Sequence, residues 1–259
     1  MRLGIKRAII VLLGIGLVFG LSGCGLIAKL KARDHLNKGV RFYSEKKYDE
    51  AVESFKESIK LDPSLTNSYL YLGMTYAALS TGRQDNANAA IKTYQEVVER
   101  AGERTDLKVI AMTSIAVLYE DLENVDKAKE WCRKILEVQP DNTEGLYRIA
   151  VIDFKLSFRK TGTTGEGVAQ LSEEEQAKTL KLIDEGITVL SKALEKNPDF
   201  SNAVDYLNLL YREQAKFTKE EDQKRELNRK ADQLSLKALE LHRKEESEKA
   251  KKGKTKKIA

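Results

Sequence analysis

The stretch YLYLGMTY, residues 69–76, contains a Leu-Gly pair that is followed three residues later by Tyr76. Thirty-four residues before Gly73 and Tyr76, the chain has Gly39 and Phe42. Self-similarity at a fixed period of roughly 20 to 50 residues is the signature of a repeat architecture. The sequence therefore predicts a chain built from repeats of about 34 residues.

A second half completes each repeat. The segment YDEAVESF contains Ala51 and Phe55, four residues apart, and Pro63 follows it. The two halves together resemble the tetratricopeptide repeat (TPR), a helix-turn-helix unit of about 34 residues. The chain has three prolines, Pro63, Pro140 and Pro198. Each follows an apolar-periodic helix and precedes another, which is where proline can end one repeat and start the next.

Five such units fit between residues 32 and 242. The resemblance implies an all-α fold, a right-handed superhelical solenoid of about five helix-turn-helix units. Small residues occupy the positions where two helix backbones must approach, namely Gly39, Gly73, Ala116 and Ala150. These are predicted core positions, and Cys132, which stands at the slot of Phe55, is interpreted as a buried small hydrophobe.

Four positions depart from the family pattern. Asp153 replaces an aromatic residue, Asn208 a small one, Ser235 a large apolar one, and Gly102 a proline. The resemblance is accordingly stronger for the first three units than for the fourth and fifth.

Three units carry insertions between their helices, and the longest contains KTGTTGEG followed by SEEEQ. Ser172 and Glu175 have the spacing of a capping box, and Thr218 and Glu221 repeat that spacing in the fifth unit. The insertions are therefore predicted to lengthen the second helices of these C-terminal units. Extended helices on one face of a solenoid are often where a partner binds.

The N-terminus has the order of an exported chain, in which cationic MRLGIKR precedes apolar AIIVLLGIGLVFG and then small residues. Residues 8–28 are uncharged, a length that also spans a bilayer, so an uncleaved transmembrane anchor is a competing interpretation. LSGC, residues 21–24, resembles the lipobox of bacterial lipoproteins. That resemblance implies that the Cys24 thiol is acylated and that the preceding peptide is removed.

The expected organisation has four parts: a lipoprotein signal peptide (1–23), a lipidated tether (24–31), a TPR solenoid (32–242) and a basic, disordered tail (243–259). Gly25 follows the cysteine, where an aspartate would resemble an inner-membrane retention signal. The expected location is the bacterial cell envelope, lipid-anchored and facing the periplasm, with the outer membrane favoured over the inner.

Catalytic and metal chemistry is not expected. With two cysteines and two histidines, a zinc-type site is improbable. The segment GTTGEG lacks the Gly-Lys-Ser/Thr ending of a phosphate-binding loop and a preceding strand. A rival interpretation, an enzyme activity in the insertion near residues 160–180, would need a nucleophile-base pair or metal ligands, and that stretch has neither histidine nor cysteine. We therefore expect no catalytic residue, no metal, no cofactor and no small-molecule substrate.

The resemblance also implies a binding groove, because in this family the first helices of successive units line a concave surface that holds an extended peptide or a helix. The residues carried over to that groove are Leu36, Val40, Tyr43, Asn67, Leu70, Met74, Thr113, Val117, Glu120, Tyr147, Val151, Phe154, Asp205, Leu209 and Arg212. The Lys and Asn pattern with which some relatives clamp a C-terminal carboxylate is absent, because Leu36 and Val40 stand there. A hydrophobic peptide or helix is the expected ligand.

The expected function is that of a bacterial TPR lipoprotein, a membrane-anchored scaffold that binds protein partners and supports assembly of an envelope complex. Membrane attachment is expected through Cys24. Nucleic acid is not an expected partner, because the basic tail has no aromatic residues on which bases could stack. Two alternatives stay open: the groove is filled by the chain's own linker or its long C-terminal helix, or the N-terminus remains an uncleaved span. The sequence does not indicate an oligomeric state.

Overall fold

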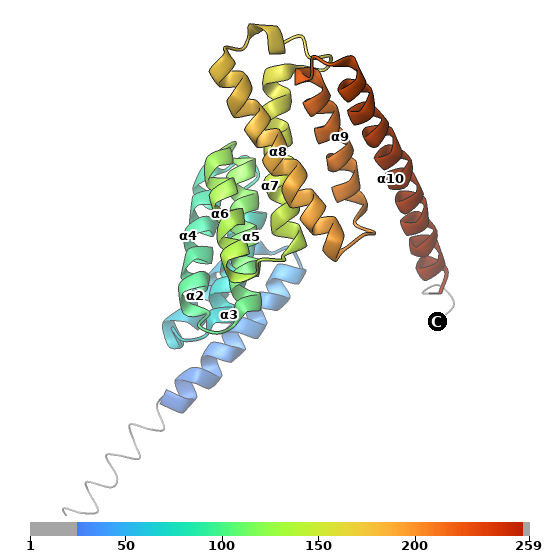
Figure 1. Cartoon of the computed structure of the whole chain (residues 1–259). Helices are drawn as coiled ribbons and strands as arrows, with labels where there is room; N and C mark the ends of the chain where they lie inside the picture. Colours follow the sequence, from blue (N-terminus) through green and yellow to red (C-terminus); the bar gives the residue numbers. More distant parts are fainter. Residues whose placement is uncertain (1–24, 256–259) are drawn as a thin grey trace, which may run out of the picture. The chain divides into compact units, whose positions relative to one another are not determined.

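The structure, a computed structural model, describes residues 25–255, with side chains through Lys251 (Figure 1). These residues lie in helices or in the turns between them, and no strand occurs among them. In chain order the helices are residues 25–44 (the first helix), α2 (Tyr48–Leu61), α3 (Thr66–Ala78), α4 (Gln84–Arg100), α5 (Thr105–Asp121), α6 (Val125–Val138), α7 (Thr143–Thr161), the 3-10 helix η1 (Val168–Gln170), α8 (Glu173–Lys196), α9 (Ser201–Phe217) and α10 (Glu221–Thr255). The predicted all-α fold of consecutive helix-turn-helix pairs is confirmed.

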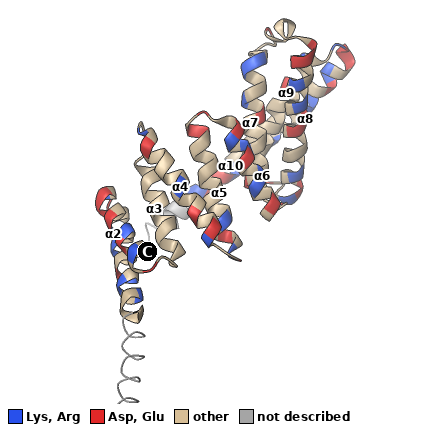
Figure 2. Ribbon diagram, turned by 90° about the vertical axis from the view of Figure 1, so that its left-hand side faces the viewer, with Lys and Arg blue, Asp and Glu red and all other residues tan. Residues whose placement is uncertain are grey.

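The chain divides into two compact units, one ending at Glu123 and the other beginning at Asn124. In the first unit, α2 packs against α3, α3 against α4, and α4 against α5. Figure 2 shows acidic and basic residues interspersed along the helices of both units.

Glycine allows close helix approach in the first unit. A Cβ atom built on Gly39 would lie 2.5 Å from the ring of Phe55, and one on Gly73 would lie 2.9 Å from the ring of Tyr94. Both rings are almost completely buried. Each ring therefore occupies the space that a side chain on the facing helix would need, which confirms the role predicted for these small residues.

The turns inside the first three helix pairs share one backbone feature. The residue directly before the N-cap has a positive φ, which is 58° at Lys46, 69° at Gly82 and 56° at Glu123. Glycine adopts this left-handed conformation without strain, whereas a residue with a Cβ does not. Two of the three turns thus hold a strained non-glycine residue.

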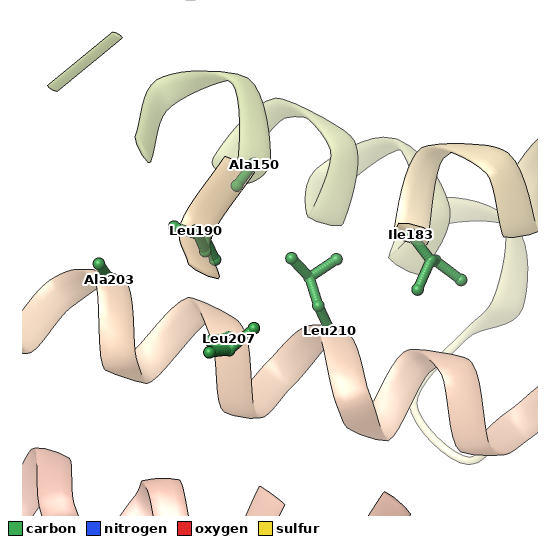
Figure 3. Packing of buried hydrophobic residues seen from close by; sticks show 6 residues of the cluster. All are labelled: Ala150, Ile183, Leu190, Ala203, Leu207 and Leu210. Carbon is green, nitrogen blue, oxygen red and sulfur yellow. The ribbon is translucent and has the colours of Figure 1, made fainter. Parts of the chain in front are cut away.

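The second unit has its core where α7, α8 and α9 meet. Figure 3 shows the buried side chains of this cluster, which are Ala150, Ile183, Leu190, Ala203, Leu207 and Leu210 (Figure 3). The last helix, α10, packs against α9 through Ala238, Leu241 and Val204. Burial of these aliphatic groups is the main source of stability for the helix pairs, because isolated helices are marginal in water.

The predicted helical insertions are present. α8 has 24 residues and α10 has 35. The capping box at the start of α8 is confirmed, because the Ser172 side chain accepts a hydrogen bond from the Glu175 backbone N–H and the Glu175 carboxylate accepts one from the Ser172 N–H. The second predicted capping box does not form at Thr218. Its hydroxyl donates to the Gln214 carbonyl at 3.1 Å, so Thr218 ends α9 and the next helix begins later.

The C-terminal region differs from the disordered tail predicted from Arg243, because α10 stays helical to Thr255. Two contacts with α9 and its preceding turn hold this stretch: Lys244 donates to Asp199 at 2.8 Å, and Ser201 donates to Glu245 at 2.7 Å. Beyond them, lysine, glutamate and alanine are good helix formers, and extending an existing helix avoids the cost of nucleation. Residues 256–259 lie outside the described residues.

The N-terminal boundary also differs from expectation. Residues 25–31, predicted as a tether, form the beginning of the first helix, which therefore starts before residue 32. The expected signal peptide (1–23) and Cys24 lie outside the described residues. Within residues 25–255, none of the helices combines the length and the apolar character needed to cross a bilayer.

Candidate functional site

The first helix places three predicted groove residues partly in the core. Leu36, Val40 and Tyr43 are half-buried, and they pack against the cluster around Phe55. The Tyr43 ring centroid lies 5.6 Å from that of Tyr48, at the start of α2. Burial raises the pKa of the Tyr43 phenol. These residues therefore offer an apolar surface that is already supported from behind by the hairpin.

Helices α3 and α5 supply the next predicted residues. Asn67 is exposed, whereas Leu70, Met74, Val117 and their neighbours Thr113 and Glu120 on α5 are half-buried. Glu120 also makes an interaction of its own within the structure. The predicted groove residues of α3 and α5 are thus mixed in polarity, with apolar Leu70, Met74 and Val117 and polar Asn67, Thr113 and Glu120.

A cavity of about 290 Å³ opens beside two of these residues. Its lining residues are Ala77, Ser80, Tyr94, Thr113, Ser114, Val117, Leu118 and Asp121. The Tyr94 hydroxyl is hydrogen-bonded to Ser114, and burial raises the pKa of Tyr94 to about 12. The phenol therefore stays protonated at neutral pH. The cavity is close to the lower limit of ordinary ligand pockets, about 300 Å³, so it suits one side chain of a partner better than a metabolite.

The second unit contains an aromatic cluster, defined as Tyr147, Phe154 and Phe158 of α7 with Phe200 and Tyr206 at α9. The ring centroid of Tyr147 lies 5.1 Å from that of Phe200 and 5.5 Å from that of Tyr206. Phe154 lies 5.6 Å from Tyr206 and 5.5 Å from Phe158. These separations are in the range of favourable aromatic pairs.

The aromatic cluster joins two predicted groove residues to three that sequence reasoning missed. Tyr147 and Phe154 were predicted, as was Val151 between them, which is buried. Tyr206, Phe200 and Phe158 were not. Phe158 is 38% exposed, so the cluster reaches the surface. Helical periodicity could have indicated Phe158, because Tyr147, Phe154 and Phe158 stand at positions i, i+7 and i+11 and so share one face of α7.

Burial raises the pKa of Tyr147 to about 12, and nearby Tyr206 and Glu144 act in the same direction. The phenol is therefore neutral at physiological pH and serves as a hydrogen-bond donor at the edge of an apolar surface. Such a combination suits contact with a partner's backbone or side chains.

The predicted groove residues of α9 are engaged by α10. Asp205 pairs with the imidazole Nε2 of His242 at 2.6 Å, and Arg212 donates to Asp232 at 2.7 Å. Arg212 also donates to Asn208 at 2.9 Å, which accounts for the polar residue at a position where the pattern has a small one. In the fifth helix pair, two positions expected to meet a partner instead hold the C-terminal helix.

The unexpected aspartate of the fourth repeat, Asp153, belongs to a buried ionic network. Asp153 of α7 accepts a hydrogen bond from Lys129 of α6, which also donates to Glu185 of α8 at 2.9 Å. Arg133 reaches the other oxygen of Glu185 at 2.9 Å. Burial raises the pKa of Asp153 to about 6, although the bond to Lys129 opposes the shift. The network links three helices at a position where the repeat pattern has an aromatic residue.

The long insertion is fixed to α9 by a second buried carboxylate. Glu213 accepts hydrogen bonds from the Thr161 hydroxyl at 2.6 Å and from Lys216 at 2.5 Å, and Lys216 also donates to the Gly162 carbonyl at 2.6 Å. In the loop itself, the Glu166 carboxylate accepts bonds from the backbone N–H and hydroxyl of Thr164, each at 2.8 Å. These carboxylates are therefore used to hold the loop and helix together.

No group of three or more potential metal ligands occurs in the part of the chain that the structure describes. Cys132 is buried and makes no disulfide there, in agreement with its predicted place in the core.

Comparison with known families identifies repeats in two segments. Residues 39–80 match a TPR repeat model and residues 110–142 match a tetratricopeptide repeat model. One curated relative is the uncharacterised protein ycf37 of Guillardia theta, which is 28% identical over 120 residues. That alignment covers 44% of this chain and 62% of the relative, so the chain spans less than two thirds of its length.

Solved structures show the same fold. The chain is similar to the crystal structure of MamA protein, with a TM-score of 0.58 and 16% identity, over 84% of this chain and 94% of that one. It is also similar to MamA 41-end from Desulfovibrio magneticus RS-1, with a TM-score of 0.55 and 14% identity, over 83% of this chain and 96% of that one. The family matches and the all-helical fold support a TPR protein and, with it, a protein-protein interaction module.

Proposed function

We propose that this protein is a non-enzymatic scaffold, tethered to a bacterial membrane through acylated Cys24, that holds a protein partner against the first helices of its TPR pairs. The observation that carries the proposal is the aromatic cluster of α7 and α9. It presents Phe158 at the surface and backs it with half-buried Tyr147, Phe154 and Tyr206. Rigid aromatic groups of this kind are the side chains most often responsible for binding energy at interfaces.

The partner that fits this chemistry is a hydrophobic peptide or an amphipathic helix. An apolar helix face can lie on the aromatic cluster, and the Tyr147 hydroxyl can donate to its backbone or polar edge. In the first unit, Leu36 and Val40 provide apolar surface where a carboxylate clamp would need cations. A partner that presents apolar side chains is therefore favoured over one that presents a free C-terminus.

The proposed location is the periplasmic side of the bacterial envelope, at the outer membrane, where the scaffold supports assembly of an envelope complex. Support for the tether comes from the sequence alone, in the order of charge, apolar run and LSGC at residues 21–24. An acylated cysteine would attach the chain stably, because each buried methylene contributes about 0.8 kcal/mol.

The tether is tested by metabolic labelling with a fatty acid and by the mass of the mature N-terminus. We expect the wild-type chain to begin at an acylated Cys24 and Cys24→Ala to lose both label and processing. A chain that retains residues 1–23 and carries no acyl group would replace the lipid anchor with an uncleaved transmembrane anchor.

Partner binding is tested in intact cells with a photo-crosslinking amino acid. Asn67 on α3 lies on the predicted groove and is exposed, and Lys92 on α4 is an exposed position on a second helix. We expect a defined adduct with the probe at Asn67 and none with the probe at Lys92. Equal adducts at the two positions would place the binding surface elsewhere.

The aromatic cluster is tested separately with Phe158→Ala, the member that is more than one third exposed. Leu236→Ala on α10 is the matched control, because Leu236 is 64% exposed. With the photo-crosslinking amino acid at Arg159, an exposed position on α7, we expect the Phe158 variant to lower the yield of crosslinked partner and the Leu236 variant to leave it unchanged. A lower yield of crosslinked partner in both variants would indicate that the effect is not specific to the aromatic cluster.

A further inference from the structure

The first helix begins with an apolar patch that is left exposed by the residues that the structure describes. The patch, here called the N-terminal patch, consists of Leu26, Ile27 and Leu30, which are 62%, 55% and 58% exposed. Isolated exposed leucines are common on protein surfaces, but three large aliphatic residues within five positions form a contiguous surface.

The N-terminal patch lies on the side of the helix that faces away from the protein. Ala32 is fully buried, and its carbonyl accepts a hydrogen bond from the Ser58 hydroxyl of α2 at 2.7 Å. At about 100° per residue, the patch covers an arc on the other side of the helix. In Figure 1 the first helix extends past the end of α2. The patch is therefore no part of the hairpin core.

Cations surround the patch. Lys29, Lys31 and Arg33 are exposed, and residues 25–33 contain no acidic residue. Lys29 and Arg33 lie close enough to Asp62 to lower the pKa of its carboxyl, after the larger effect of Ser64. Aliphatic residues combined with lysine and arginine are the composition of helices that lie in a membrane interface, where long basic side chains reach the headgroups.

The patch also follows directly on the apolar part of the sequence. Residues 8–23 contain no charged residue, and Leu26 comes only two positions after Cys24. The nearness of the patch to a membrane depends on the proposed anchor: an acylated Cys24 lies two positions before Leu26, and an uncleaved span over the uncharged residues 8–28 would reach the start of the patch. A bilayer is therefore the apolar partner that the chain itself brings into reach.

We propose that the N-terminal patch docks on an anionic bilayer, with Leu26, Ile27 and Leu30 in the interfacial region and the surrounding cations at lipid phosphates. Cationic side chains near a membrane surface are attracted to anionic lipids. This contact goes beyond the proposed tether, because it acts through the helix. A tether alone leaves the first hairpin free to rotate, whereas a docked helix fixes its direction relative to the membrane.

The test measures depth on the full chain, reconstituted in vesicles of phosphatidylcholine and phosphatidylglycerol. A fluorescent amino acid is placed in turn at Leu30, at Lys29 and at Leu236, the last being an equally exposed leucine on α10. We expect a lipid-soluble quencher to act most strongly on the probe at Leu30. Aqueous iodide should quench the probe at Leu236.

The comparison of Leu30 with Lys29 separates docking from simple attachment. A helix that leaves the membrane upright places position 29 deeper than position 30, because it is nearer the anchor. A helix docked through the N-terminal patch places position 30 deeper, because it faces the bilayer. Deeper quenching at position 29, or iodide access at position 30, would overturn the proposal.

Two further measurements exclude other occupants and other causes. Vesicles without phosphatidylglycerol should reduce lipid quenching at position 30, and unchanged quenching would refute the role of the cations. A blue shift at position 30 that depends on protein concentration and not on lipid would assign the patch to a second copy of the chain. Circular dichroism checks that each labelled chain is folded.

Docking of the helix and acylation of Cys24 are tested independently of each other. The depth profile is recorded for the wild-type chain and for Cys24→Ala in the same vesicles. A chain that keeps Cys24, carries no acyl group and still has position 30 in the interface would refute lipidation and keep the docked helix. An acylated chain with position 30 in water would refute docking and keep the tether.

Discussion

Asp153 of α7 pairs with Lys129 of α6 inside the second unit, at a position where the repeat pattern has an aromatic side chain. The carboxylate is completely buried, and the lysine side chain is 9% exposed. A buried charge is costly unless it is paired, since its desolvation is not recovered otherwise. The pair therefore stabilises the fold only when both partners are present.

The first prediction concerns removal of the cation. Lys129→Met leaves Asp153 buried without its positive partner, and we expect a loss of about 3–5 kcal/mol in unfolding free energy near pH 8. The penalty should shrink near pH 5, where Asp153, whose pKa is already raised to about 6, takes up a proton. Urea unfolding followed by the fluorescence of Trp131, the single tryptophan, reports on this unit.

The matched control is the double variant Lys129→Met/Asp153→Asn. Removing both charges should recover much of the loss, because no unpaired ion remains buried. If the double variant is as unstable as the single one, the penalty comes from lost packing of the lysine stem and the ionic explanation is wrong.

The second prediction concerns pH alone. The folded-state pKa of Asp153, about 6, lies above its ordinary value of 3.8. The folded chain therefore binds this proton more tightly than the unfolded chain, and the stabilisation is present below pH 4 and lost as pH rises through 6. We expect the unfolding free energy of wild type relative to Asp153→Asn to fall between pH 4 and pH 7. A constant difference would show that Asp153 titrates normally.

The structure also indicates which parts of the fold and site were readable in the sequence. Gly39 and Phe55 were predictable as core residues, because their roles depend on spacing within one repeat. Asp153 was recognised only as a departure, since its partner Lys129 and Glu185, which shares that lysine, come from other helices, 24 and 32 residues away along the chain. Short-range pattern carries no information about such pairs.

The aromatic cluster was predicted in part for a similar reason. Tyr147 and Phe154 follow from the repeat frame, and Phe158 could have been added from helical periodicity. Tyr206 could not, because its contact with α7 depends on how two helix pairs pack. The helical state of residues 243–255 was missed because apolar periodicity ends there, although helix propagation requires only good helix formers after a packed segment.

The third prediction concerns the docking of α10. The hydrogen bond to Asp205 raises the pKa of His242, and the neighbouring Glu245 contributes in the same direction. A raised histidine pKa gives a stabilising contribution that is present below the unfolded pKa, near 6.5, and lost as pH rises through the folded value. We expect amides around residues 238–245 to exchange faster at pH 8.5 than at pH 6, after correction for intrinsic rates.

His242→Gln is the control for this effect, because glutamine does not titrate. The variant should show the same corrected exchange at both pH values. A pH dependence that persists in the variant would show that it does not arise from His242.

The fourth prediction concerns the turns within the helix pairs. Gly82 has a φ of 69°, and a Cβ built there meets no atom within 4 Å. Gly82→Ala therefore tests backbone strain without a steric clash, and we expect a loss of about 1 kcal/mol. Lys46 has a φ of 58° at the equivalent place in the first pair. Lys46→Gly should relieve the backbone strain of the folded turn, and this gain should offset the greater conformational freedom of glycine in the unfolded chain. We therefore expect the unfolding free energy to be unchanged or slightly higher.

Hydrogen exchange of α4 amides for the first variant and of α2 amides for the second measures both effects locally. Opposite signs, or a loss at Gly82 and none at Lys46, agree with a turn that requires a positive φ. Equal losses in the two variants would contradict this explanation. Lys46→Gly keeps the positive φ accessible and removes only the lysine side chain, so a loss there would have to come from that side chain.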